Sequence, residues 1–438
     1  MAELKRKLTL FDLTMIAIGS TIGSGIFFTP SLIASTLQTP LLILSVWLIG
    51  GLMALSGALT FSELSSMYPN AGGVYVYLKE GYGELAGFLY GWAYFWVVNT
   101  GAIAAVAVAF ATYFSFFFSL SAGMLKLTAI SGIIVVTLVN VFGVKAGGIF
   151  SDIFTVLKLI GIVGLIFVGM FLGSFHTSDF SSKLVSDKSL SNLFAIAMVG
   201  VLWSYGGWHH ATFTSSEAIN PKKDMPRAIT IAAIVITSIY LLINLAYMFL
   251  LTPEQIGSSN TVAADAVVKV LGTIGGSLIA IVILISTFGT AGIYTLAAPR
   301  IYFAMASDKL FFSRLAEVHH KFHTPANAIV IQSVWAIILI MFWGTFENLI
   351  SYVEFVDWIF FGLTGASIFI FRKRYPYAQR STKTFAYPIT PLFFVGMAIW
   401  FVVNTLLNKP EQAWAGLIFL RMGVISFFYW RMKRNRNK

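Results

Sequence analysis

The chain alternates long apolar stretches with short polar connections over nearly its whole length. About twelve stretches are long enough for a helix to cross a bilayer, which takes about 20 residues. The connections are too short for a separate soluble domain, so we expect residues 1–438 to form a single transmembrane domain. The pattern predicts spans over residues 10–35, 41–66, 85–118, 127–147, 152–174, 190–217, 228–252, 276–306, 326–343, 349–371, 390–408 and 412–430.

Two of these spans are interrupted by glycine. The first contains Gly19-Ser20-Thr21-Ile22-Gly23-Ser24-Gly25-Ile26-Phe27, and the sixth contains Trp203-Ser204-Tyr205-Gly206-Gly207-Trp208. Glycine lets a helix unwind, and unwound backbone at membrane depth is tolerated where protein covers it or where it lines a cavity. Interrupted spans at corresponding positions indicate a transporter's substrate site. Close helix packing through Gly19 and Gly23 remains the alternative for the first span, in which Pro30 is expected to kink or end the second half-helix.

The two breaks would offer opposite partial charges. Around Gly23-Ser24-Gly25, free backbone N–H groups at the start of a new half-helix would suit a carboxylate. Around Gly206-Gly207, freed carbonyl groups would suit an ammonium. A zwitterionic α-amino acid needs both. Trp203 and Trp208 either pack against membrane neighbours or form the wall and gate of the pocket.

Lys158 is the notable charged residue inside a span. It lies roughly 9 Å from the cytoplasmic end of the fifth span at 1.5 Å per residue. Its ammonium either snorkels back to the interface or is held by carbonyl groups freed in the first and eighth spans. In the second case it would occupy the place of a sodium ion, or act as a proton site.

The other ionisable residues predict little chemistry inside the membrane. Glu63 and Glu217 fall at cytoplasmic ends of spans, so no carboxylate is expected deep in the core, which favours neutral substrates. We find no nucleophile–base pair, hence no catalytic residue and no enzyme, and we expect no metal site and no cofactor. The remaining expectations are end caps at Asp12 and Asp152, and neutral surface positions for His209, His210, His319, His320 and His323.

Composition supports a membrane protein and sets its orientation. Mean hydropathy is +0.82 and only 11% of residues are charged. With the N-terminus in the cytoplasm, the basic residues gather inside, as the positive-inside rule requires, so the net charge of +11 is no sign of a nucleic-acid partner. Both termini are then cytoplasmic, and no cleavable signal peptide is expected. Five basic residues fall outside: Lys126, Lys183, Lys188, Lys269 and Lys409.

Several motifs together resemble the amino acid–polyamine–organocation superfamily. The glycine motif of residues 19–27 is similar to the first-helix signature of that superfamily, and residues 61–75 resemble its second-helix and inner-loop signature. Residues 203–208 are similar to the sixth-helix motif of the L-type amino acid transporter branch, and residues 217–228 and 300–308 match the adjoining loop and the end of helix eight. The resemblance covers essentially the whole chain and extends to bacterial alanine–serine–cysteine exchangers of this branch.

This resemblance implies an all-α integral membrane protein with twelve transmembrane helices and a LeuT-like five-plus-five inverted repeat. Repeat one would cover about 10–174 and repeat two about 190–371, followed by two additional helices over about 390–430, with helices one and six discontinuous. Lys158 matches the lysine that takes the sodium role, and Trp203 an aromatic gate that is more commonly phenylalanine. The implied substrate-binding residues are Thr21, Ser24, Gly25, Ile26, Trp203, Ser204 and Gly206.

The leading hypothesis is therefore sodium-independent exchange of small neutral L-amino acids, such as alanine, serine and cysteine, by alternating access in a bacterial plasma membrane. Proton-coupled amino acid uptake and a non-transporting amino acid sensor remain alternatives. The expected partners are the amino acid and the lipid bilayer. Animal light chains of this branch bond a glycoprotein through an outer-loop cysteine, and this chain has no cysteine, so no disulfide-linked subunit is expected.

Overall fold

A computed structural model describes residues 6–174, 189–342, 346–408 and 410–436. Within these ranges the chain is helical and has no β-strand, although one isolated bridge pairs Leu8 with Ala218. The expected outside lysines Lys183, Lys188 and Lys409 lie beyond the described residues.

The helices follow the apolar spans in order. The first half contains α1 (Leu10–Thr21), α2 (Gly25–Leu37), α3 (Pro40–Met67), α4 (Val74–Tyr82), α5 (Glu84–Ala93), a π-helical turn (Tyr94–Val98), α6 (Asn99–Phe114), α7 (Ala122–Val141) and α8 (Val144–Leu172). The second half contains α9 (Leu190–Tyr205), α10 (His210–Phe213), a 3-10 turn (Ser215–Glu217), α11 (Pro221–Leu250), α12 (Pro253–Ser258), α13 (Val262–Ala297), α14 (Pro299–Ser307), a 3-10 turn (Ser313–Ala316), α15 (Ala326–Phe342), α16 (Phe346–Arg374), α17 (Ile389–Asn408) and α18 (Pro410–Arg436).

Nine segments of the described chain are long and apolar enough to cross a membrane. Two shorter apolar helices, α9 and α15, and the 27-residue α18 match the three remaining expected spans. The chain is therefore an all-α, multi-pass membrane protein. Its first and sixth spans are discontinuous, since α1 and α2 are separated by residues 22–24, and α9 and α10 by residues 206–209.

Two local expectations need correction. Of the two outcomes expected at Pro30, the end of the helix is wrong, because α2 continues through Pro30 to Leu37, while the kink stays a prediction. Asp152 does not cap the fifth span, because α8 begins two turns earlier, directly after Gly143, which has a φ of +139°. Asp12, in contrast, forms the expected cap, since its carboxylate accepts hydrogen bonds from the backbone and hydroxyl of Thr9.

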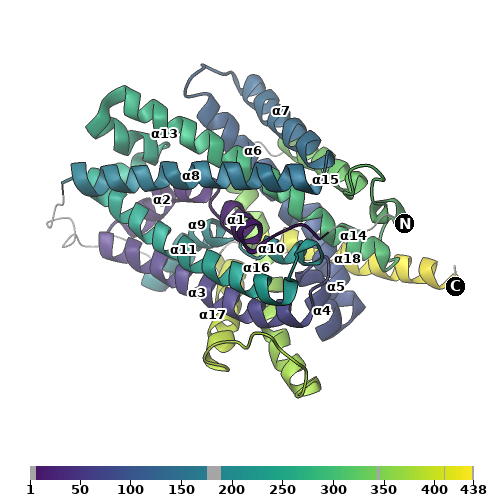
Figure 1. Cartoon of the computed structure of the whole chain (residues 1–438). Coiled ribbons are helices and arrows are strands. Elements are labelled where there is room, and N and C mark those ends of the chain that lie inside the picture. The colour runs from purple at the N-terminus through teal and green to yellow at the C-terminus, as the bar shows by residue number, and fades with distance from the viewer. Residues whose placement is uncertain (1–5, 175–188, 343–345, 409, 437–438) are drawn as a thin grey trace.

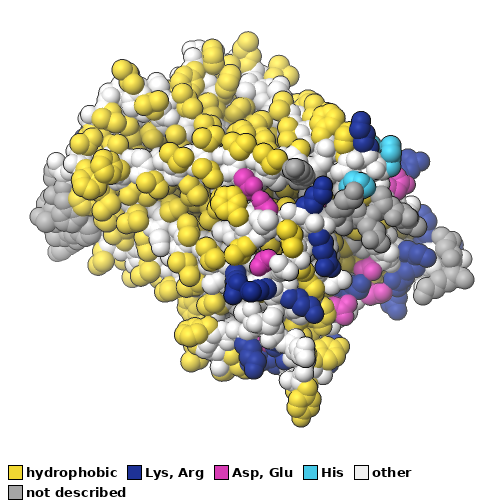
Figure 2. All heavy atoms as spheres, viewed as in Figure 1, with side chains coloured by type: hydrophobic (Ala, Val, Ile, Leu, Met, Phe, Trp, Pro, Cys, Tyr) yellow, Lys and Arg dark blue, Asp and Glu magenta, His cyan; other side chains and the backbone are white. Residues whose placement is uncertain are grey.

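The interrupted first span lies at the centre of the molecule. Figure 1 shows α1 surrounded by longer helices, and α1 packs against α8, α11 and α13. At 1.5 Å per residue, α1 and α2 are about 18 and 20 Å long, which puts their break near the middle of a bilayer about 30 Å thick. On the face shown in Figure 2, hydrophobic side chains are widespread, and basic side chains gather at the end that carries α4, α14 and the end of α18.

Candidate functional site

At the first break, α2 begins inside the protein, and its first residues are buried. Ser24 is the N-cap residue and forms no side-chain cap, and its Oγ is buried without a hydrogen-bond partner among the described residues. The N–H groups of Gly25 and Ile26 are at the first two positions of α2, where no acceptor within the helix is available. This helix start has the donors and the dipole end that bind an anion.

The second break ends α9 at Tyr205. Gly206 then adopts an extended conformation, and Gly207 has a φ of +113°, which favours glycine. The last carbonyl groups of a helix have no partner within it, so the end of α9 presents acceptors next to the first break. Trp203 and Ser204 lie in this last turn and are buried.

The two breaks contact each other through backbone. The Oγ of Ser20 donates to the carbonyl oxygen of Gly207 at 2.8 Å. A Cβ atom on Gly25 would lie 2.7 Å from Cα of Ser204, so α2 begins in direct contact with the last turn of α9. The Oγ atoms of Ser204 and Thr29 are 2.8 Å apart and join the same two helices. The structure thus brings together the seven residues that the sequence proposed for substrate binding.

Tyr240 of α11 connects both breaks, and the sequence analysis missed it. Its hydroxyl lies 3.0 Å from the carbonyl oxygen of Thr21 and 2.8 Å from that of Ser204. One hydroxyl hydrogen is shared between two carbonyl groups that the sequence assigned to a substrate ammonium. Nothing in the sequence distinguishes this tyrosine from a packing residue in an apolar span, because only the fold reveals that it reaches both helix ends.

Lys158 is fully buried and does not reach an interface. Its Nζ donates to the carbonyl oxygens of Gly19, at 2.9 Å, and Ile22, at 2.6 Å, and to Oγ1 of Thr290 at 2.8 Å. All three ammonium hydrogens therefore have an acceptor. Lys158 lies on α8, and its side chain links this helix to the end of α1 and to α13.

A cluster of buried ionisable residues lies beside the second break and corrects two expectations. Glu354 and Asp357 of α16 are 4% and 6% exposed, so the core does contain carboxyl groups. His209 and His210 are buried rather than superficial, and their Nε2 atoms lie 3.3 and 2.5 Å from the hydroxyl of Tyr94. The expected preference for neutral substrates rested on a core without carboxyl groups, and that premise is therefore wrong.

The two tryptophans of the sixth-span motif have different surroundings. Trp208 is 2% exposed and packs against Phe61 and Phe361, which makes it part of a wall between α3 and α16. Trp203 is 7% exposed and lies one turn before the second break. Trp203 lies at the end of α9 and Trp208 within the break itself, so both tryptophans flank the proposed amino-group site.

A buried ion pair links the end of the sixth span to α14. The guanidinium of Arg300 contacts the carboxylate of Glu217 through Nε at 2.7 Å and Nη2 at 3.1 Å, and both side chains are fully buried. The carbonyl oxygen of Glu217 accepts hydrogen bonds from the backbone of Lys7 and Leu8. One residue therefore joins the N-terminal segment, the end of the sixth span and α14.

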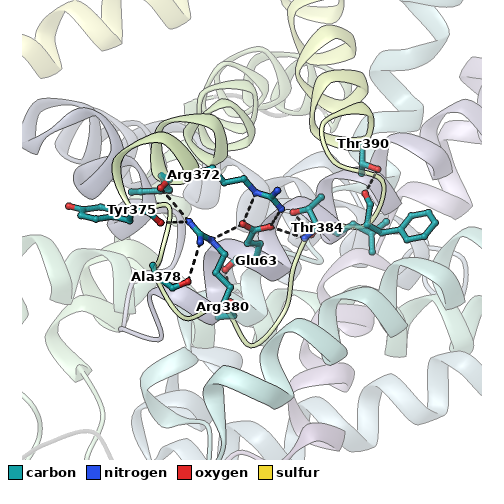
Figure 3. Close-up of polar contacts among 11 residues, drawn as sticks. Glu63, Arg372, Tyr375, Ala378, Arg380, Thr384 and Thr390 are labelled. Carbon is teal, nitrogen blue, oxygen red and sulfur yellow. Dashed lines mark hydrogen bonds and ion pairs between the residues drawn. The ribbon is translucent and has the colours of Figure 1, made fainter.

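A second network of ion pairs surrounds Glu63 near the end of α3 (Figure 3). Its carboxylate pairs with Arg372 of α16, at 2.7 Å, and with Arg380, at 3.0 Å. The backbone N–H of Thr384 also donates to it at 2.7 Å. The network fastens the connection between α16 and α17 onto α3.

A third and more exposed contact involves Asp308, which follows α14. Its carboxylate accepts from Lys79 Nζ and from the hydroxyl of Tyr75, both at 2.6 Å. Burial and the neighbouring carboxylate of Asp308 raise the pKa of Tyr75 well above its usual value, so this hydroxyl is a neutral donor. The motifs singled out in residues 61–75, 217–228 and 300–308 thus meet on one side of the molecule.

Comparisons with known proteins agree with this arrangement. A family model described as amino acid permease matches residues 8–428. The chain is 31% identical to the serine/threonine exchanger SteT of Bacillus subtilis (strain 168) over 429 residues, which cover 97% of this chain and 96% of that protein. It is 30% identical to the human large neutral amino acids transporter small subunit 2, over 98% of this chain and 82% of that protein.

A third relative is the mouse b(0,+)-type amino acid transporter 1, which is 27% identical over 97% of this chain and 88% of that protein. Family and relatives are transporters and not enzymes. Two broken helices that meet inside a multi-pass helical membrane protein are also the architecture expected of such carriers. The chain therefore belongs to the amino acid permease family, in the L-type branch of the amino acid–polyamine–organocation superfamily.

Proposed function

We propose that this protein exchanges L-amino acids across a bacterial plasma membrane by alternating access, without sodium, and that small neutral amino acids such as alanine, serine and cysteine are its substrates. The contact between the two helix breaks carries the proposal. The start of α2 offers N–H donors to a carboxylate, while the ends of α1 and α9 offer carbonyl acceptors to an ammonium. Such a pair of opposite sites fits the two charged groups of a zwitterion.

In this proposal each predicted site residue has a role. Ser24, Gly25 and Ile26 bind the substrate carboxylate through their amides, and Thr21, Trp203, Ser204 and Gly206 contribute carbonyl groups for the amino group. Tyr240 holds the carbonyl oxygens of Thr21 and Ser204 in place and is displaced from them, or shares them, when an ammonium arrives. The side chain of Trp203 acts as the gate over the bound amino acid.

Sodium independence is supported by the environment of Lys158. A sodium ion at this position would need oxygen ligands from the broken first helix and from α13. The ammonium already contacts such oxygens, namely Gly19 O, Ile22 O and Thr290 Oγ1. A fixed positive charge supplied by the protein replaces a charge that would otherwise come from solution.

A small substrate is supported by close packing at the breaks. The start of α2 touches Ser204, and the hydroxyls of Thr29 and Ser204 are bonded to each other. By the positive-inside rule, the end of the molecule where basic side chains gather in Figure 2 faces the cytoplasm in this proposal, and both termini are on that side of the membrane.

Transport in proteoliposomes tests the proposal. Uptake of radiolabelled alanine is expected only when the vesicles contain an amino acid, and replacing sodium with potassium should not change it. Uptake into empty vesicles driven by external acid would instead indicate proton coupling. Saturable binding with no flux in either condition would indicate a sensor, and both of these outcomes contradict exchange.

The Gly25→Val variant tests the placement of the carboxylate. Its side chain would occupy the space now filled by Ser204, so substrate affinity should be lost. Gly164→Ala is a matched control on α8, since nothing lies within 4 Å of its added Cβ. Native affinity in Gly25→Val would refute the assignment.

A further inference from the structure

The buried acidic cluster beside the second break has no role in holding the amino and carboxylate groups of a substrate. Glu354 Oε2 accepts a hydrogen bond from Nε1 of Trp358 at 2.8 Å, which fixes the orientation of the carboxyl group. Oε1 points toward the break, because it lies 3.9 Å from the position of a Cβ on Gly206. One oxygen is thus anchored by a tryptophan and the other faces the proposed substrate site.

The groups around Glu354 have unused hydrogen-bonding capacity. Oδ1 of Asp357 and Nδ1 of both His209 and His210 are buried, and none of them has a hydrogen-bond partner among the residues that the structure describes. No lysine or arginine of the described chain forms an ion pair with Glu354 or Asp357. Buried polar atoms normally find partners, so unsatisfied atoms next to a ligand site indicate a polar ligand.

We propose that Glu354 accepts a hydrogen bond from the side chain of the substrate and thereby selects hydroxyl-bearing amino acids, serine and threonine, over apolar amino acids of equal size. This inference rests on the proposed function, since it assumes that the amino acid lies at the two breaks. Glu354 then acts as the specificity-determining residue, and Trp358 positions it.

The physical reason is that a buried acceptor penalises a ligand that cannot donate. An apolar substrate of the size of threonine, such as valine, would desolvate Oε1 of Glu354 and give it no partner. A site built to bond a substrate hydroxyl therefore discriminates more strongly against the missing hydroxyl than an apolar pocket does against an added methyl group. Threonine and valine have nearly the same shape and differ in the hydroxyl. The ratio of their competition strengths therefore isolates the contribution of the hydrogen bond to Glu354.

The test is competition by threonine and by valine against alanine exchange in proteoliposomes. In the unmodified protein threonine should compete more strongly than valine by roughly fivefold, the factor typical of one net hydrogen bond. Glu354→Met should bring the ratio close to one. Glu354→Gln, which keeps an acceptor for Trp358, should give an intermediate ratio.

Controls separate this inference from folding and from the function itself. Glu254→Met replaces an exposed glutamate on α12 and should leave the ratio unchanged. If Glu354→Met is not monodisperse by size-exclusion chromatography, the ratio of threonine to valine competition measured in Glu354→Gln alone tests the inference. Failure of the unmodified protein to exchange any amino acid would sink the proposed function, whereas exchange with equal competition by threonine and valine would overturn only this inference.

Two other results would also overturn it. Lysine competing more strongly than threonine, with the advantage abolished in Glu354→Gln, would make the cluster a site for cationic side chains. A variant that alters only the response to a pH gradient, with the native ratio of threonine to valine, would make Glu354 a proton site.

Discussion

Ser20 and Gly207 hold the two helix breaks together at the centre of the protein. The hydroxyl of Ser20 donates to the carbonyl oxygen of Gly207, and a Cβ atom on Gly207 would lie 2.5 Å from the carbonyl oxygen of Ser20. The approach is so close that only a residue without a side chain fits. The same residue has a positive φ, so both space and conformation require glycine.

We expect Gly207→Ala to abolish exchange and to destabilise the protein. The added methyl group must push the breaks apart, and the backbone strain alone is of order 1–3 kcal/mol. Exchange rates and the midpoint of thermal unfolding in detergent measure the two effects. Gly164→Ala, with open space around its Cβ, should change neither, and normal exchange by Gly207→Ala would contradict the close contact.

Lys158→Ala should slow exchange while the protein still folds. The substitution removes the ammonium donor from the carbonyl oxygens of Gly19 and Ile22, which keep only the hydroxyl donors of Thr290 and Ser286, and hydrogen bonds of a charged group are worth about 1.5–3 kcal/mol each. Initial rates measured from each side of the membrane, with and without sodium, report the effect. Unchanged kinetics would mean that the ammonium is a packing feature and not part of the transport cycle.

Tyr240→Phe should weaken substrate binding by roughly tenfold, the factor that corresponds to about 1.4 kcal/mol. The variant keeps the ring, which packs against Trp47 and Tyr205, and removes only the hydroxyl between the two carbonyl groups. A binding isotherm on purified protein measures the loss. Tighter binding would instead show that the hydroxyl competes with the substrate ammonium for the carbonyl oxygens.

Glu217→Gln should destabilise the protein strongly, because the side chains of Glu217 and Arg300 form a fully buried ion pair. Removing one partner leaves the guanidinium of Arg300 buried and uncompensated, a loss of about 3–5 kcal/mol. The double variant Glu217→Leu with Arg300→Met should recover much of it. Asp308→Asn disrupts a partly exposed pair and should cost about 0–1 kcal/mol by the same denaturation measurement.

The sequence predicted the helical membrane fold and both breaks because their signals are local. Twelve apolar stretches identify spans, and paired glycines mark where a helix unwinds. How deeply a single side chain is buried, and toward which neighbour it points, depends on residues far away in the sequence. Glu354 and Asp357 lie inside the predicted span over residues 349–371, so their place within the membrane could have been read from the sequence, whereas the neighbours that cover their face of α16 could not.

The histidines show a second reason. His209 and His210 were assigned to the surface on the assumption of regular helical geometry. They follow Gly207, whose positive φ turns the chain, so helical periodicity does not apply and both rings point into the core. Asp152 illustrates a third reason, since a cap can be recognised only when the start of the helix is known to within a residue or two.

Glu217 has a consequence for how fast the carrier can work. The ion pair of Glu217 with Arg300 and three backbone hydrogen bonds between residues 7–8 and 217–219 hold the segment before α1 against the end of the sixth span. The ion pair and two of these hydrogen bonds involve Glu217, so we expect them to break together when α1 moves, at a large activation enthalpy. We therefore expect turnover to rise steeply on warming, with an Arrhenius slope that flattens when the Arg300 contact is removed.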